Sequence, residues 1–112
     1  GKSLIKMQQE AGDIYISDAV LEYISRLTAK TREDEVITLG VSPRGALALS
    51  RMAKARAYLL GRDYVVPEDV QEVFTDVCGH RIVLNPKARI SNVTPETVLN
   101  KILQNTEAPG VE

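Results

Sequence analysis

Residues 42–61 read SPRGALALSRMAKARAYLLG and predict a long helix with both of its ends marked. Ser42 can cap the first turn, and Pro43 suits the first helical position because it lacks the N–H that would be unpaired there. Gly61 is a natural stop at the other end. A spacing of three or four predicts one buried face, which consists of Ala46, Leu49, Ala53, Ala57 and Leu60.

Upstream of this helix the chain predicts one more helix and one extended segment. The helix covers 18–30, with Ser17 as its cap. Its apolar stripe consists of Val20, Ile24 and Leu27, and Lys30 or Thr31 follows at the same spacing. The charged run 31–35 lacks periodicity and indicates a loop, whereas 37–41 alternates apolar and other residues as a short extended segment does.

Downstream, the sequence predicts two further helices separated by an irregular stretch. Pro67 opens a helix that runs to about Gly79, and Thr94 precedes the last helix. The apolar stripes consist of Val70, Val73, Phe74 and Val77 in the first helix and of Val98, Leu99, Ile102 and Leu103 in the second. The stretch 82–93 shows only a brief alternation and is expected to be irregular.

Together these elements predict an all-α fold, a small bundle of about four helices with little or no sheet. We expect a linker over 1–16, one helical domain over 17–106 and a frayed tail over 107–112.

The composition of the chain excludes several classes of protein. Its 112 residues suffice for one domain but not for a complete nucleotide-driven motor or a two-domain enzyme. One Cys and one His exclude a disulfide framework and a zinc cluster, so no metal ligands are expected. A net charge of −1 argues against a surface built for nucleic acid. No apolar run is long enough to span a membrane, and we expect a cytoplasmic protein.

Arg44 occupies a position of the long helix where a positive charge is unfavourable. It falls in the first turn, where the helix dipole disfavours a cation. It also points almost opposite the predicted buried face, so it would lie beside unpaired N–H donors that attract an anion such as phosphate. The alternative is a solvated surface arginine. Leu47 and Ala48 share its side of the helix, which indicates either a second layer of core or a covered interface.

Other polar residues have plainer interpretations. His80 has no nucleophile or carboxylate at a suggestive spacing, which favours a structural role near a helix end. Cys78 lies beside the apolar stripe and is expected to be a core thiol. The basic residues of the long helix lack interleaved aromatic residues, so they give little support to nucleic-acid binding.

Three segments, in this order, resemble signatures of the MoxR-type AAA+ ATPases. The first is Thr31-Arg32 followed by LGVSPRG over 39–45, which resembles their sensor-2 segment. The second is GRDYVVPEDV over 61–70, and the third is HRI over 80–82. Val66 departs from the pattern because a Ser or Thr would cap the next helix better, so that helix start must rely on Asp69 or on packing.

This resemblance implies the C-terminal helical lid of such an ATPase. In the family the lid packs over bound ATP, and the residue equivalent to Arg44 reaches the γ-phosphate and couples hydrolysis to lid movement. Gly40, Ser42 and Pro43 would shape the turn that aims Arg44. Leu47 and Ala48 would lie near the nucleotide or the large domain.

The resemblance also implies partners and a task. The lid would work with its own nucleotide-binding domain, which holds Mg²⁺, in a homo-hexamer that remodels or assembles client proteins as a chaperone does. A von Willebrand factor A-domain protein is an expected partner. The chain contains no Walker A or Walker B segment, so we expect it alone not to hydrolyse ATP. The alternative hypothesis is a stand-alone helical module that binds protein or nucleic acid.

Overall fold

The computed structural model describes residues 13–110, and it confirms a mostly helical bundle with a very small sheet. In chain order the elements are α2 (Asp18–Glu33), β1 (Ile37–Leu39), α3 (Pro43–Leu59), α4 (Pro67–Cys78), β2 (Val83–Leu84), α5 (Pro86–Ile90) and α6 (Pro95–Gln104). Most of the predicted linker over 1–16 lies outside the described residues.

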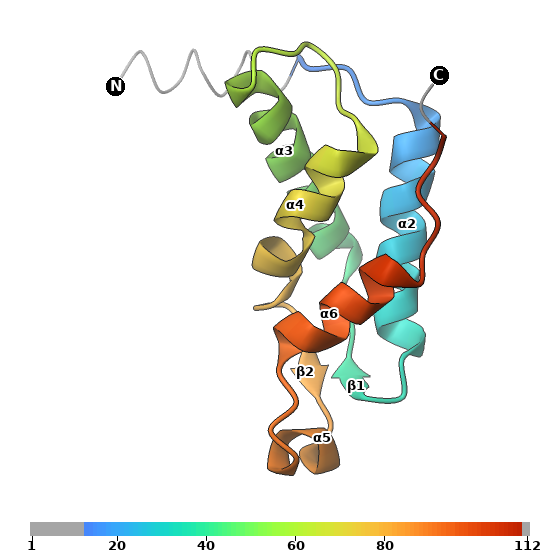
Figure 1. The fold of residues 1–112 in the computed structure, drawn as a ribbon, viewed down its shortest axis with the longest axis vertical. Coiled ribbons are helices and arrows are strands. Elements are labelled where there is room, and N and C mark those ends of the chain that lie inside the picture. The colour runs from blue at the N-terminus through green and yellow to red at the C-terminus, as the bar shows by residue number, and fades with distance from the viewer. Residues whose placement is uncertain (1–12, 111–112) are drawn as a thin grey trace.

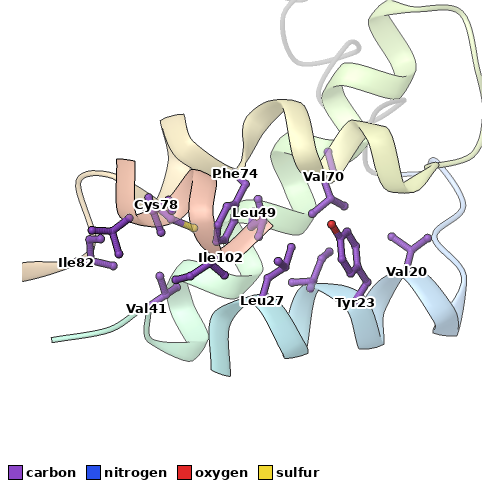
Figure 2. Close-up of a cluster of buried hydrophobic side chains, with 14 of the residues drawn as sticks. Val20, Tyr23, Leu27, Val41, Leu49, Val70, Phe74, Cys78, Ile82 and Ile102 are labelled. Carbon is purple, nitrogen blue, oxygen red and sulfur yellow. The ribbon is translucent and has the colours of Figure 1, made fainter. Parts of the chain in front are cut away.

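The four long helices among residues 13–110 enclose one core (Figure 1). α3 packs along α4, α2 lies on the other side, and α6 crosses in front, in contact with both α2 and α4. The sheet and α5 form one end of the molecule. Figure 2 shows the core between the helices, where the labelled side chains are Val20, Tyr23, Leu27, Val41, Leu49, Val70, Phe74, Cys78, Ile82 and Ile102.

The structure confirms the start of the long helix predicted from 42–61 and most of its predicted buried face. Ser42 is the cap and Pro43 begins the helix. Leu49, Ala53 and Ala57 are fully buried, but Leu60 is 57% exposed, so its placement on this face was wrong. The helix ends at Leu59, because Gly61 takes a φ of 80° and turns the chain away.

The charged run 31–35 was wrongly expected to be entirely a loop, because α2 continues to Glu33. Thr31 is fully buried, and its hydroxyl donates to the Thr28 carbonyl at 2.6 Å. Of the two residues that the spacing of the stripe offered next, Lys30 and Thr31, it is therefore Thr31 that lies in the core.

The stretch 82–93 is more regular than expected, since it contains β2 and α5. β2 pairs antiparallel with β1, with Leu84 opposite Ile37. Asn85 caps α5 by accepting from the Ala88 N–H at 2.8 Å, and Pro86 occupies the first turn.

The end of the described chain, residues 105–110, lies along α2, and we call it the C-terminal strap (Figure 1). Lys30 Nζ donates to the Asn105 carbonyl at 2.9 Å, and Arg26 Nη1 donates to the Glu107 carbonyl at 3.0 Å. Thr106 is buried between these two contacts.

Within residues 13–110, no helix has the length and apolar character needed to cross a membrane. In the same range, His, Cys, Asp and Glu do not gather in groups of three or more that could hold a metal ion.

Candidate functional site

The turn that leads into α3 is held by the last turn of α2. The Val41 N–H donates to Thr31 Oγ1 at 2.9 Å, and the Val41 carbonyl accepts from Arg32 Nη1 at 2.8 Å. Val41 itself is fully buried. Both backbone polar groups of this residue are therefore satisfied by side chains of α2, which fixes the point where α3 begins.

Two glycines in this turn allow the backbone to pack closely. A Cβ on Gly40 would lie 2.7 Å from the backbone nitrogen of Arg32, closer than real contacts allow. A Cβ on Gly45 would lie 2.6 Å from Val41 Cγ1 and 3.1 Å from Arg81 Cδ. The start of α3 is therefore packed between α2 and the segment that follows α4.

The first turn of α3 uses the cap that the sequence predicted. Ser42 Oγ accepts from the Gly45 N–H at 3.3 Å, and Pro43 has no N–H to satisfy. Gly40, Ser42 and Pro43 are thus brought together in one turn.

Arg44 follows this turn directly and is exposed. Among residues 13–110 its guanidinium makes no hydrogen bond or ion pair, and the first turn of α3 carries no acidic residue. An arginine beside the positive end of a helix dipole is electrostatically unfavourable without an anion. Its position fits an anionic ligand such as a phosphate, which would bind both the guanidinium and the dipole.

Leu47 and Ala48 lie on the side of α3 that carries Arg44, opposite Leu49 and Ala53. Leu47 is 50% exposed and Ala48 is half-buried. This side is the covered-interface candidate of the sequence analysis, and in the described chain it faces outward.

The second signature segment contains a buried ion pair instead of an open cation. Arg62 donates to both carboxylate oxygens of Asp69, at 2.8 and 2.7 Å, and Arg56 donates to Asp69 Oδ1. Asp69 is fully buried and also accepts from the Val66 N–H at 2.8 Å. Asp69 therefore fastens the start of α4 from the third helical position by binding the N–H of Val66, while Val66 itself makes no side-chain cap; reliance on Asp69 was one of the two possibilities that the sequence left open.

The titration of Asp69 reflects two opposed effects. Burial alone would raise the pKa of this carboxyl, but hydrogen bonds from Arg62, the Val66 N–H and Arg56 outweigh it, and its pKa lies below the ordinary value. The same pair raises the pKa of Arg62. Both groups are charged at neutral pH.

The residues of the third signature segment have different surroundings. His80 is exposed, whereas the stem of Arg81 lies over Gly45 at the start of α3. Cys78 is fully buried, as expected of a core thiol, and burial raises its pKa to about 12.

Three side chains outside the α3 turn hold it in place, and the sequence did not predict their contacts: those of Thr31, Arg32 and Arg81. Thr31 fits the spacing of the α2 stripe and stands with Arg32 in a signature segment, but neither pattern predicts a contact with Val41, and no sequence pattern places Arg81 at this turn. Their contacts join residues distant in sequence, so no local spacing could have indicated them.

Comparisons with known proteins show the family to which this chain belongs. Residues 29–102 match the family described as AAA lid domain. The chain is 35% identical over 108 residues to the uncharacterized protein YeaC of Bacillus subtilis, covering 96% of this chain and 34% of that protein. It is 35% identical over 117 residues to the chaperone MoxR1 of Mycobacterium tuberculosis, covering 96% of this chain and 31% of that protein.

A solved structure is similar over the same extent. A crystal structure of a "putative ATPase" from Cytophaga hutchinsonii matches with a TM-score of 0.85 and 33% identity, covering 91% of this chain and 34% of that chain. The chain thus spans about a third of the length of the relatives that it matches.

Proposed function

Because this chain belongs to the AAA lid domain family, in its MoxR-like branch, we propose that it closes over ATP and places Arg44 at the γ-phosphate. The nucleotide would be held by the nucleotide-binding domain of the same protein, which also holds Mg²⁺. Arg44 would then couple ATP hydrolysis to movement of the lid.

The observation that carries the proposal is the contrast between the fixed backbone at Arg44 and its free side chain. Contacts from Thr31 and Arg32 hold Val41, and Ser42 caps the helix, so the backbone of Arg44 has a fixed position. The guanidinium has no partner within residues 13–110. A cation that is held in position and has no partner of its own can stabilise negative charge on a ligand without first breaking a bond, as a preorganised electrostatic site requires.

The chemistry of Arg44 would be electrostatic. A guanidinium presents a planar fork of N–H donors that matches two phosphate oxygens and keeps its charge at all physiological pH values. At the γ-phosphate it would favour ATP over ADP and stabilise the charge that spreads over the transferred phosphoryl group. Leu47 and Ala48, one turn further, would contact the nucleotide or the nucleotide-binding domain.

The larger setting of the lid is also part of the proposal. We propose that the whole protein is an ATP hydrolase, that it acts as a cytoplasmic homo-hexamer in remodelling or assembling client proteins, and that this chain alone is inactive. A von Willebrand factor A-domain protein is the proposed partner. These points rest on the resemblance of the three signature segments, and the kinship to the chaperone MoxR1 supports them.

The test replaces Arg44 in the whole protein. Arg44→Ala should lower kcat for ATP hydrolysis by about 10³-fold or more, the effect of removing an arginine from a phosphoryl-transfer site. The melting temperature should stay within about 1–2 °C of the starting value because the side chain is exposed and unpaired. Arg44→Lys should recover only part of the rate because the ammonium lacks the planar fork.

The matched control is Arg89→Ala, which removes an exposed arginine from α5. It should leave both kcat and the melting temperature unchanged. Turnover retained by Arg44→Ala would refute the role of Arg44 at the γ-phosphate.

A further inference from the structure

The segment just before α2 is bound to the connection between α3 and α4. The Tyr15 N–H donates to the Asp63 carbonyl at 2.9 Å, and the Val65 N–H donates to the Tyr15 carbonyl at 2.8 Å. These bonds form a parallel bridge between Tyr15 and Tyr64. In Figure 1 the blue segment ahead of α2 passes beside the loop that joins α3 to α4.

Ile14 secures the same segment through packing. Its side chain is only 7% exposed and belongs to the core, whereas the side chain of Tyr15 is 65% exposed. Residues 14–16 are therefore attached by one buried side chain and two backbone hydrogen bonds.

The partner strand of this bridge is itself fixed by Arg62. Arg62 Nη1 donates to the Tyr64 carbonyl at 2.9 Å, and its guanidinium lies 5.8 Å from the centroid of the Tyr64 ring. Arg62 Nη1 and Nη2 both donate to the carboxylate of Asp69, which also accepts from the Val66 N–H. The backbone on each side of Val65 is thus tied to one ion pair, and we call this unit the clamp (residues 14–16, 62–66 and Asp69).

The clamp is continuous with α3. Arg56, in the last turns of α3, donates to the same carboxylate, and the Arg62 N–H donates to the Ala57 carbonyl at 2.9 Å. α3 carries Arg44 at its opposite end. A displacement of residues 14–16 would therefore reach Arg44 through Asp69 and the rigid body of α3.

We propose that Arg62 and Asp69 are positioning residues, which hold residues 14–16 on the same rigid body as α3 so that movement between the domains is transmitted to Arg44. This inference rests on the proposed function, in which the chain enters the lid from the nucleotide-binding domain. Neither residue touches ATP; each acts through the backbone that it holds.

The first test is Arg62→Lys in the whole protein. Lysine keeps the charge but cannot bind both oxygens of Asp69 and the Tyr64 carbonyl together. The amides of Tyr15 and Val65 should exchange with solvent about tenfold faster or more, since the clamp opens locally. The kcat for ATP should fall about tenfold, while KM stays within about twofold, because misplacement of a remote group lowers the rate of the chemical step.

A second variant avoids the ion pair altogether. Tyr15→Pro removes the N–H that donates to Asp63 and leaves Arg62 and Asp69 in place. Because the Tyr15 side chain is mostly exposed, little packing is lost. This variant should show the same fall in kcat, which tests the clamp even where Arg62→Lys fails to fold.

The matched control is Arg26→Lys. Arg26 resembles Arg62 in binding a backbone carbonyl, that of Glu107 at 3.0 Å, and in lying 5.7 Å from the centroid of a tyrosine ring. It should lower the melting temperature less than Arg62→Lys does, because Arg26 binds no buried carboxylate, and it should leave kcat unchanged. A purely structural role for Arg62 predicts an unchanged kcat for both variants, and that outcome would overturn the inference.

The two proposals fail in different ways. In an Arg44→Ala background, Arg62→Lys should cause no further loss of kcat, because both changes act at the same step. Faster exchange at Tyr15 with full turnover would refute the transmission but leave Arg44 its role. Full turnover of Arg44→Ala would refute the proposed function, while the exchange rates would still report whether Arg62 holds the clamp.

Discussion

The two ends of α3 each carry an arginine from a signature segment, and the two side chains have opposite surroundings. Arg44, at the start, is exposed and binds no group among residues 13–110. Arg62, just beyond the end, makes two bonds to Asp69 and one to the Tyr64 carbonyl. At the start of α3, side chains of α2 hold the backbone of Val41, whereas beyond its end Arg62 itself holds the carbonyl of Tyr64.

The difference shows how a structural arginine can be told from a candidate functional one. The N–H donors of Arg62 bind groups within the chain, so this residue contributes first to the fold. The guanidinium of Arg44 binds no group among residues 13–110, although contacts from Thr31, Arg32 and Ser42 fix its backbone. A firmly placed but unpaired charge is the better candidate for a ligand outside the chain.

The largest expected effect contrasts the two ends directly. Asp69→Ala should lower the free energy of unfolding by about 3–5 kcal/mol, because Arg56 and Arg62 lose the carboxylate between them. Arg44→Ala should change it by less than about 0.5 kcal/mol, as an exposed substitution does. Urea unfolding of the chain measures both values. A similar loss in the two variants would show that Arg44 is also a structural residue.

A smaller effect is expected where α2 holds the α3 turn. Thr31→Val should cost about 1–3 kcal/mol, because the buried N–H of Val41 loses its acceptor. Thr31→Ser retains the hydroxyl and should recover most of the loss. Unfolding by urea gives the stability, and equal losses for the valine and serine variants would mean that packing, not the hydrogen bond, holds this turn.

The smallest expected effect is a change in how stability depends on pH under acidic conditions. Since the pKa of folded Asp69 lies below its ordinary 3.8, its contribution to stability is complete above that value and is lost as pH falls through the folded pKa. Asp69→Asn should therefore weaken the decline in stability as the pH falls below 3.8. The control is Glu72→Gln, an exposed carboxylate of α4. An acid profile unchanged by Asp69→Asn would contradict the low pKa.

Sequence reasoning succeeded where the signal is local. Ser42 with Pro43 and Thr94 with Pro95 mark helix starts within a few residues, and both starts are confirmed. The same reasoning failed at Leu60 although Gly61 marked the stop correctly, because Leu60 is the C-cap residue and its backbone leaves the helical path on which the spacing depends. Asn85 with Pro86 carried the same signal as the other starts, but α5 is too short to show an apolar stripe.

The candidate site was predictable only in part. The outward position of Arg44 followed from the helix period, and its exposure is confirmed. The contact of Thr31 with Val41 and the pairing of Arg56 with Asp69 join different elements, which no periodicity reports. The role of Arg44 at a phosphate came from the resemblance and stays a prediction.

The C-terminal strap has a consequence for how this family can diverge. Arg26 and Lys30 bind the carbonyls of Glu107 and Asn105, not their side chains. A carbonyl is present whatever residue occupies those positions, so substitutions at 105 and 107 leave both bonds intact. In this chain the surface chemistry of positions 105 and 107 can therefore change without loss of these two bonds, while Thr106, which is buried, is constrained by packing.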